Sequence, residues 1–229
     1  MSGNEDVFQR DAAEDARAFE LQRTFRALLA CMARPGEVVC LEASEAAALE
    51  APETGLFPGT LMLADALLDA GTTFAVATDE DDRATDFIAR RTHAVAAPAE
   101  RAAYVLVPEA MRGERAAQSI AMLFPGTLEE PHRGATAIVE CSVLLGHAAD
   151  GSRVGSAAHA HAKSCWELSG PGIEDTSRIV LDRADVMFAR QDRSDEFPCG
   201  IDIVFADGFG HMVAVPRSSA CKEVESWDM

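Results

Sequence analysis

Ile201-Asp202-Ile203-Val204-Phe205-Ala206 and Met212-Val213-Ala214-Val215 are two β-rich runs, separated by Asp207-Gly208-Phe209-Gly210. Branched and aromatic residues on both sides of a Gly-containing turn predict an antiparallel β-hairpin. Alternation along the first strand places Asp202 on the same face as Val204 and opposite Ile201, Ile203 and Phe205.

Asp202 is an acid inside this apolar strand. If both faces of the strand are covered, the carboxylate needs a partner, because an unpaired buried charge is costly. Arg217 follows Val215-Pro216 and can reach Asp202 across the hairpin. We expect this pair to be structural, and a ligand clamp only where other features support that role.

Upstream of the hairpin, helical and strand patterns alternate at short spacing. Apolar residues at helical spacing predict helices over residues 19–33, 58–68, 82–91 and 113–124, the first ended by Arg34-Pro35-Gly36. β-rich runs predict strands at residues 37–41, 73–77, 94–96, 104–107 and 135–145. This alternation predicts an α/β layer architecture with a largely parallel sheet, made mixed at one end by the hairpin.

The chain of 229 residues has the length of one large domain or two small ones, and no shift in composition marks a boundary. We predict a polar leader over residues 1–15, a single α/β domain over 16–220 and a polar tail over 221–229. The Gly-, Ser-, Ala- and His-rich stretch from Gly146 to Lys163 predicts a long loop. The hexapeptide Leu-Phe-Pro-Gly-Thr-Leu occurs at 56–61 and 123–128, and we interpret it as one Pro-Gly turn used twice.

The charge balance narrows the possible ligands. The chain carries 38 acidic and 20 basic residues, a formal charge of −18. Phosphate polyanions would be repelled by such a surface, which argues against a nucleic-acid or anionic-membrane binder. Any anionic substrate must therefore be bound by local arginines and backbone amides. We expect Arg34, Arg133 and Arg217 to cluster for this purpose.

Cysteine usage and the N-terminus indicate a cellular compartment. Six cysteines are scattered without a Cys-x-x-Cys pair, which favours small buried hydrophobic residues over a disulfide framework. Residues 1–14 are polar and acidic rather than a signal peptide, and no apolar run approaches the roughly 20 residues that span a bilayer. These features predict a reduced cytoplasmic protein with no membrane segment.

Three segments carry candidate chemistry, each with a plainer alternative. His132 and Arg133 precede a predicted strand, where His132 can act as acid or base and Arg133 can bind phosphate oxygens; the alternative is a charged loop that caps the sheet. Ser169-Gly170-Pro171-Gly172 can direct amides at an anion, or form a tight turn. His159 and His161 can contribute to a metal site, but the flexible loop lacks the spacing of a zinc motif, and we predict no metal.

Lysine is scarce: Lys163 and Lys222 are the only two. A pyridoxal phosphate enzyme holds its cofactor through a lysine Schiff base, so this composition disfavours that chemistry. Lys222 lies in the predicted tail, which leaves Lys163 as the one candidate. We predict no cofactor.

Several of these segments, in their order along the chain, resemble the PhnH family, a subunit of the bacterial carbon–phosphorus lyase system for phosphonate breakdown. The segments run from Thr24 to Ser219 and comprise Phe25–Leu29, Met32–Gly36, Gly126–Leu128 ahead of Pro131, Gly134–Thr136, Leu168–Ile173, Phe197–Asp202 and Ala214–Ser219. The last two are the most specific. The stretch from His147 to Cys165 departs from the family pattern, so His159 and His161 inherit no role.

The resemblance implies a cytoplasmic homodimer with a three-layer mixed-sheet α/β fold similar to pyridoxal phosphate-dependent transferases, without the cofactor. It implies partners similar to PhnG, PhnI and PhnJ, in a complex that with PhnL forms ribose 1-phosphonate 5-triphosphate from MgATP and a phosphonate. It assigns no independent catalytic activity to this subunit. We carry Arg34, Arg133, Ser169, Gly170, Gly172, Asp202 and Arg217 as candidate residues for binding substrate or partners. The alternative function is a stand-alone enzyme acting on a phosphorylated small molecule through His132 and Arg133.

Overall fold

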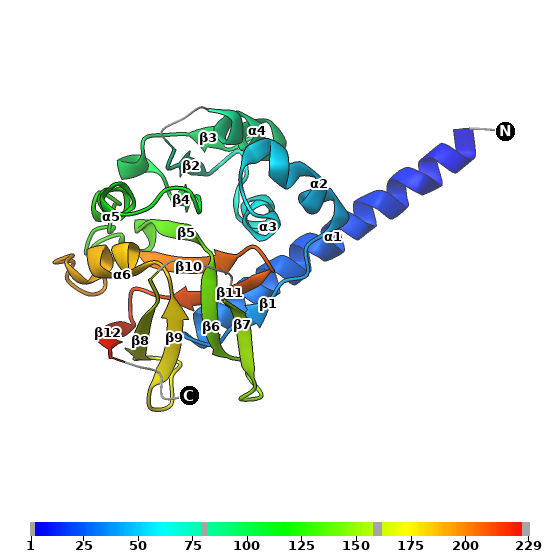
Figure 1. Cartoon of the computed structure of the whole chain (residues 1–229). Helices are drawn as coiled ribbons and strands as arrows, with labels where there is room; N and C mark the ends of the chain where they lie inside the picture. The colour runs from blue at the N-terminus through cyan, green and yellow to red at the C-terminus, as the bar shows by residue number, and fades with distance from the viewer. Residues whose placement is uncertain (1–2, 79–81, 158–161, 226–229) are drawn as a thin grey trace.

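The computed structural model describes residues 3–78, 82–157 and 162–225, with side chains described from residue 15 onward. This part of the chain forms two β-sheets and six α-helices in a mixed α/β architecture (Figure 1). Among these residues, no helix combines the length and the apolar composition that crossing a membrane requires.

Seven strands form a mixed sheet through the middle of the molecule. In spatial order they are β1 (Val39–Cys40), β11 (His211–Val215), β10 (Asp202–Asp207), β5 (Thr136–Cys141), β4 (Tyr104–Val107), β2 (Thr73–Val76) and β3 (Val95–Ala96). Strands β10 to β3 run parallel, whereas β11 is antiparallel to β10 and β1 is antiparallel to β11. The predicted hairpin and the predicted mixed sheet are therefore confirmed.

A second sheet is antiparallel throughout. Its order is β12 (Ala220–Val224), β8 (Ser164–Ser169), β9 (Ser177–Leu181), β6 (Val143–His147) and β7 (Arg153–Ala157). We did not predict this sheet, and part of the tail assigned to residues 221–229 pairs within it as β12.

The continuous strand predicted over residues 135–145 is wrong, because the run is divided between β5 in the first sheet and β6 in the second. The Asp182 carboxylate fixes the change of sheet by accepting hydrogen bonds from the backbone nitrogens of Ser142 at 3.2 Å and Val143 at 3.1 Å. Both halves have the same β-branched character, so composition carries no sign of the break.

The long loop predicted from Gly146 to Lys163 is also wrong in part, because it contains strand β7. Gly155 in that strand has φ +120°, and a Cβ there would lie 1.9 Å from the carbonyl oxygen of Leu144 on β6. The glycine thus permits a close approach of the two strands. Residues 158–161, which include His159 and His161, lie outside the described part of the chain.

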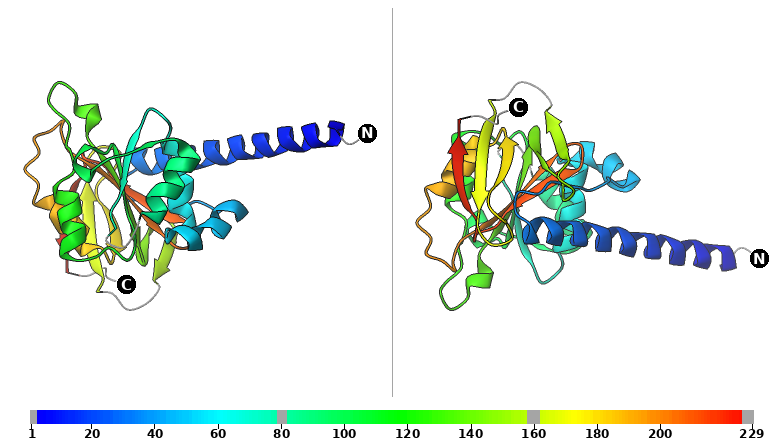
Figure 2. Two further views of the ribbon diagram at one scale, coloured as in Figure 1. Left: turned by 90° about the horizontal axis from the view of Figure 1, so that it is seen from above. Right: turned by 90° about the horizontal axis from the view of Figure 1, so that it is seen from below.

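Helices cover one face of the mixed sheet. They are α1 (Gly3–Ala33), α2 (Glu45–Thr54), α3 (Pro58–Leu67) and α4 (Arg83–Thr92). Leu28 of α1 and Met62 of α3 are buried in one cluster with Val204 of β10, and a neighbouring cluster joins α4 to β2 and β4. Both views of Figure 2 show the N-terminal part of α1 extending beyond the rest of the molecule.

The opposite face of the mixed sheet is covered by α5 (Glu114–Ala121), α6 (Ala184–Gln191) and the second sheet. Ile203 and Phe205 belong to this cluster, whereas Val204 and Ala206 belong to the cluster under α1 and α3. The alternation predicted for this strand is confirmed, and both of its faces are covered. The mixed sheet is thus the middle of three layers.

Several predicted helices need adjustment. The first begins at Gly3 rather than near residue 19, although it ends before Arg34-Pro35-Gly36 as predicted. We predicted neither α2 nor α6. Ser44 caps α2 by accepting a hydrogen bond from the Ala47 nitrogen at 3.2 Å, and Gly55 ends that helix in the left-handed conformation.

The Gly-Pro-Gly turn packs against the end of α1. Gly172 has φ +84°, and a Cβ there would lie 2.3 Å from the carbonyl oxygen of Ala33. Gly55 also has a positive φ, +70°, but a Cβ there meets nothing within 4 Å. The two glycines share a backbone conformation and differ in the space around them.

We therefore expect Gly172→Ala to lower the free energy of unfolding more than Gly55→Ala does. Both variants incur about 1–2 kcal/mol for a left-handed alanine, and Gly172→Ala adds about 1–3 kcal/mol for the forced displacement of α1. Urea denaturation of the two variants measures the difference. Equal losses would contradict the close packing described above.

Candidate functional site

Arg217 and Asp202 form the ion pair that the sequence predicted. The Arg217 Nη2 and Asp202 Oδ2 atoms are 2.6 Å apart, and the backbone nitrogen of Arg217 donates to Asp202 Oδ1 at 2.8 Å. The two side chains are only 17% and 13% exposed. Because Asp202 begins β10 and Arg217 follows β11, the pair closes the open end of the hairpin.

Arg217 also holds the loop that precedes β5. Its Nη1 donates to the carbonyl oxygen of Pro131, and its Nη2 donates to that of Gly134 at 3.2 Å. Gly134 is itself confined, since a Cβ there would lie 2.4 Å from the carbonyl oxygen of Gly200. Three segments that carry the sequence resemblance therefore meet at one guanidinium group.

His132 and Arg133 are exposed on a 3₁₀ turn (Pro131–Arg133) between the two carbonyls that bind Arg217. Arg133 pairs with Glu130 at 2.8 Å, and this hydrogen bond lowers the pKa of the Glu130 carboxyl. Neither His132 nor Arg133 lines any of the four cavities described below. Their positions agree with the charged loop better than with an enclosed acid–base site.

Arg34, Arg133 and Arg217, which we expected to cluster, each pair with a carboxylate. Arg34 pairs with Glu37 at 2.8 Å, so each of the three arginines binds a different carboxylate. The sequence showed that arginines were available but not which carboxylate each would meet.

Ser169, Gly170 and Gly172 lie at the end of β8 and in the turn that follows it. The Ile173 nitrogen donates to the Gly170 carbonyl at 3.2 Å, as in a tight turn, and a Cβ on Gly170 would lie 2.9 Å from the Ser218 carbonyl oxygen. The adjoining cavity, about 650 Å³, is lined by Glu37, Glu174 and Asp175 as well as by Arg178. Arg178 is paired with Glu167, so this cavity does not favour an anion.

A second cavity, about 190 Å³, lies at the carboxyl ends of β2 and β4 and includes Thr78, Arg83 and Pro108 in its lining. The strand order reverses here, because β2 leads outward to β3 whereas β4 leads to β5 on the other side. Ligands of open α/β sheets usually bind at such a point. Our sequence prediction placed the polar site before β5, at the amino ends of the parallel strands and therefore on the opposite side of the sheet from this cavity.

Buried polar groups lie beside this edge. Glu140 of β5 is fully buried and accepts hydrogen bonds from the backbone nitrogens of Phe57 at 2.6 Å and Glu109 at 3.0 Å. Burial raises the pKa of the Glu140 carboxyl to about 7, against the opposing effect of these hydrogen bonds. Nearby, Arg112 bridges Glu109 at 2.5 Å and Asp182 at 2.9 Å.

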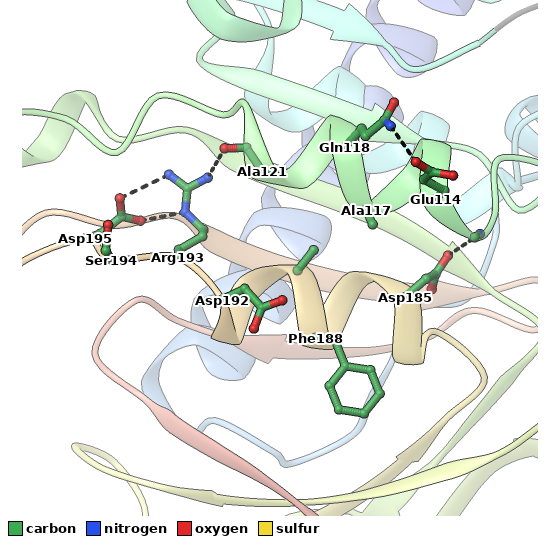
Figure 3. Close-up of a pocket in the computed structure, with 12 residues that line it drawn as sticks. Glu114, Ala117, Gln118, Ala121, Asp185, Phe188, Asp192, Arg193, Ser194 and Asp195 are labelled. Atoms are coloured by element: carbon green, nitrogen blue, oxygen red, sulfur yellow. Dashed lines mark hydrogen bonds and ion pairs between the residues drawn. The ribbon is translucent and has the colours of Figure 1, made fainter.

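The largest of the four cavities is a groove of about 720 Å³ between α5 and α6 (Figure 3). Its lining contributes four carboxylates and one arginine; these residues are Glu114, Asp185, Asp192, Asp195 and Arg193. Arg193 is bound to Asp195 at 2.5 Å and to the carbonyls of Ile120, Ala121 and Leu123 at the end of α5. This acidic groove disfavours a phosphonate or a nucleotide.

The fourth cavity, about 120 Å³, is lined by three arginines: Arg190, Arg193 and Arg217. Asp195, Cys199, Gly200, Ile201 and Ser219 complete its lining. Sequence reasoning found Arg217 and missed the other two, because helix α6 was not predicted. The sequence signal that could have located this helix end was Arg190, because basic residues are favoured in the last turn of a helix.

A cofactor lysine or a metal centre would be built from Lys, His, Cys, Asp or Glu side chains. Both lysines are exposed, and neither lines these four cavities. Within residues 3–78, 82–157 and 162–225, no group of three or more His, Cys, Asp or Glu side chains is placed to hold a metal ion.

Comparisons with known proteins agree with the sequence resemblance. The family model described as "Bacterial phosphonate metabolism protein (PhnH)" matches residues 13–222. A relative from Stutzerimonas stutzeri, the "Putative C-P lyase subunit protein HtxG", is 30% identical over 202 residues, which cover 86% of this chain and 84% of that protein.

Glu140 is expected to make the stability of the protein depend on pH. Its folded-state pKa of about 7 lies above the ordinary 4.5, so its contribution is present below pH 4.5 and is lost as the pH rises toward 7. The free energy of unfolding should fall by up to about 1.4 kcal/mol per pH unit in that window.

Glu140→Gln should remove this component of the slope, whereas Glu100→Gln, at an exposed carboxyl, should leave it unchanged. Urea denaturation between pH 4.5 and pH 8 measures both variants. If the Glu140→Gln slope matches that of the unmodified protein, the carboxyl is ionised in the folded state.

Proposed function

Because this chain belongs to the PhnH family of bacterial phosphonate metabolism proteins, we propose that it is a subunit of a carbon–phosphorus lyase complex. The observation that carries the proposal is the family match, which extends from α1 to β12 and so includes both sheets. The relative named as a putative C-P lyase subunit also matches along most of its length. The matched regions therefore correspond to the whole layered fold rather than to one motif.

The site geometry supports a role that depends on partners. Asp202 and Arg217 neutralise each other, and Arg112 is bound by two carboxylates, those of Glu109 and Asp182. His132, the candidate acid or base for a stand-alone enzyme, is exposed outside the four cavities. These arrangements favour the subunit over an enzyme that acts through His132 and Arg133.

We further propose that the partners are similar to PhnG, PhnI and PhnJ. In such a complex this chain would support the formation of ribose 1-phosphonate 5-triphosphate from MgATP and a phosphonate, in the cytoplasm. The likeness of its three layers to pyridoxal phosphate-dependent transferases stays a prediction from the family resemblance.

Co-expression with the neighbouring lyase subunits tests this assignment. We expect a tagged chain to co-purify with them, and the assembled complex to release adenine from MgATP in the presence of a phosphonate. Omission of the chain should abolish that release. A chain that purifies alone, while the other subunits assemble and release adenine without it, would sink the proposal.

We also propose that the chain forms a homodimer through α1. Phe25 and Leu29 are 44% and 50% exposed, and they lie four residues apart on one face of that helix. Phe19, farther toward the N-terminus, is 72% exposed. Neighbouring exposed apolar side chains are typical of protein–protein contacts.

Light scattering after size-exclusion chromatography should give twice the chain mass for the unmodified protein. Phe25→Asp combined with Leu29→Asp should shift it to the monomer, because two carboxylates would be buried in the interface. Leu49→Asp, at an exposed leucine of α2, is the matched control and should remain a dimer. A dimer that survives the α1 substitutions would place the interface elsewhere.

A further inference from the structure

The cavity of about 120 Å³ bordered by Arg190, Arg193 and Arg217 has an unusual charge balance. Arg193 is paired with Asp195, and Arg217 is paired with Asp202. Arg190, in contrast, has neutral partners: the carbonyl oxygens of Pro216 and Ser219, both at 2.8 Å, and the sulfur of Cys221 at 3.1 Å.

Arg190 makes no ion pair with any residue that the structure describes. The cavity therefore carries one uncompensated positive charge in a chain whose formal charge is −18. A partly buried cation without a counter-ion is costly. An anion bound in the cavity would remove that cost.

Two hydrogen-bonding groups in the cavity lining also lack partners within the described residues. The Nε of Arg190 and the hydroxyl of Ser219 are buried and make no hydrogen bond. Ser219 is only 4% exposed. Buried polar groups are normally paired, and a guanidinium Nε and a hydroxyl in the lining of one cavity are both suitable donors to the oxygens of a phosphate-like group.

The size of the cavity limits what it can hold. A volume of about 120 Å³ equals that of roughly four water molecules, which is room for one tetrahedral group and not for a nucleotide. Gly200 lines the cavity without a side chain, which lets the backbone lie close to Arg217. A Cβ at this position would lie 3.0 Å from the Cβ of Arg217.

We propose that this cavity binds a single tetrahedral phosphorus oxyanion, with Arg190 and Ser219 as its principal ligands. The identification of that oxyanion as the phosphonate group of a substrate rests on the proposed function. The ion-paired arginines Arg193 and Arg217 shape the cavity walls and add positive potential. A phosphate group shares the same chemistry, and the experiment distinguishes the two sources.

Isothermal titration calorimetry on the full-length chain tests the site, with methylphosphonate and inorganic phosphate as separate ligands. We expect binding with a dissociation constant near or below about 1 mM. Arg190→Gln should weaken it by at least about tenfold through the loss of a charged donor. Arg178→Gln removes an equal charge at a site paired with Glu167 and should change the affinity by less than about twofold.

Ser219→Ala keeps the test valid if Arg190→Gln does not fold, because it deletes one hydroxyl without changing charge. It should weaken binding by roughly fivefold, with an unchanged circular dichroism spectrum. Tighter binding of methylphosphonate than of phosphate supports a phosphonate substrate, whereas the reverse order supports a phosphate compound and overturns the phosphonate identification.

Failure to bind either ligand, or equal binding by Arg190→Gln and the unmodified chain, would overturn the oxyanion site. Such a result would leave the proposed function standing if the chain still co-purifies with the lyase subunits. If the chain binds the anion but no longer co-purifies with the lyase subunits, the oxyanion site stands and the proposed function fails.

Discussion

The guanidinium group of Arg217 joins parts of the chain that are far apart in sequence. It pairs with Asp202 at the start of β10 and donates to the carbonyls of Pro131 and Gly134 ahead of β5. Both strands are central in the mixed sheet, and the contact lies where both begin. Since the pair is largely buried, removing one partner would leave a charge without compensation. Gly134 and Gly200 lie so close to Arg217 that a Cβ at either position would contact its side chain.

The same junction creates the arginine-lined cavity. The turn after Arg217 presents carbonyls of Pro216 and Ser219 to Arg190 of α6, and Gly200 forms part of the wall. The residues that hold this turn in place therefore also line the proposed anion site. A residue such as Arg217 can stabilise the fold through Asp202 while also shaping the cavity. The larger groove between α5 and α6 has the opposite charge, so volume alone does not identify the place for an anion.

The two copies of the hexapeptide Leu-Phe-Pro-Gly-Thr-Leu have the same sequence but different backbone conformations. In its first copy, Pro58 occupies the first turn of α3, and a Cβ on Gly59 would meet nothing within 4 Å. In its second copy, Gly126 has φ +82°, and a Cβ there would lie 2.9 Å from the Pro131 carbonyl oxygen. The prediction of one turn used twice is wrong: residues 58–60 begin α3, at the start predicted for that helix, and residues 124–127 form no assigned turn. The same six residues thus begin a helix in the first copy and form an irregular segment with a left-handed glycine in the second.

By itself, the sequence determined the hairpin, the two faces of β10 and the pairing of Asp202 with Arg217. These depend on alternation and on residues brought together by one short turn, so local patterns suffice. Its ordered motifs also led to the family. Only the tertiary structure decided that the run from Ala135 to Leu145 serves two sheets, and that Arg190 and Arg193 join Arg217 around a cavity. Those outcomes depend on contacts across many tens of residues, such as Asp182 with Ser142, which no local periodicity encodes.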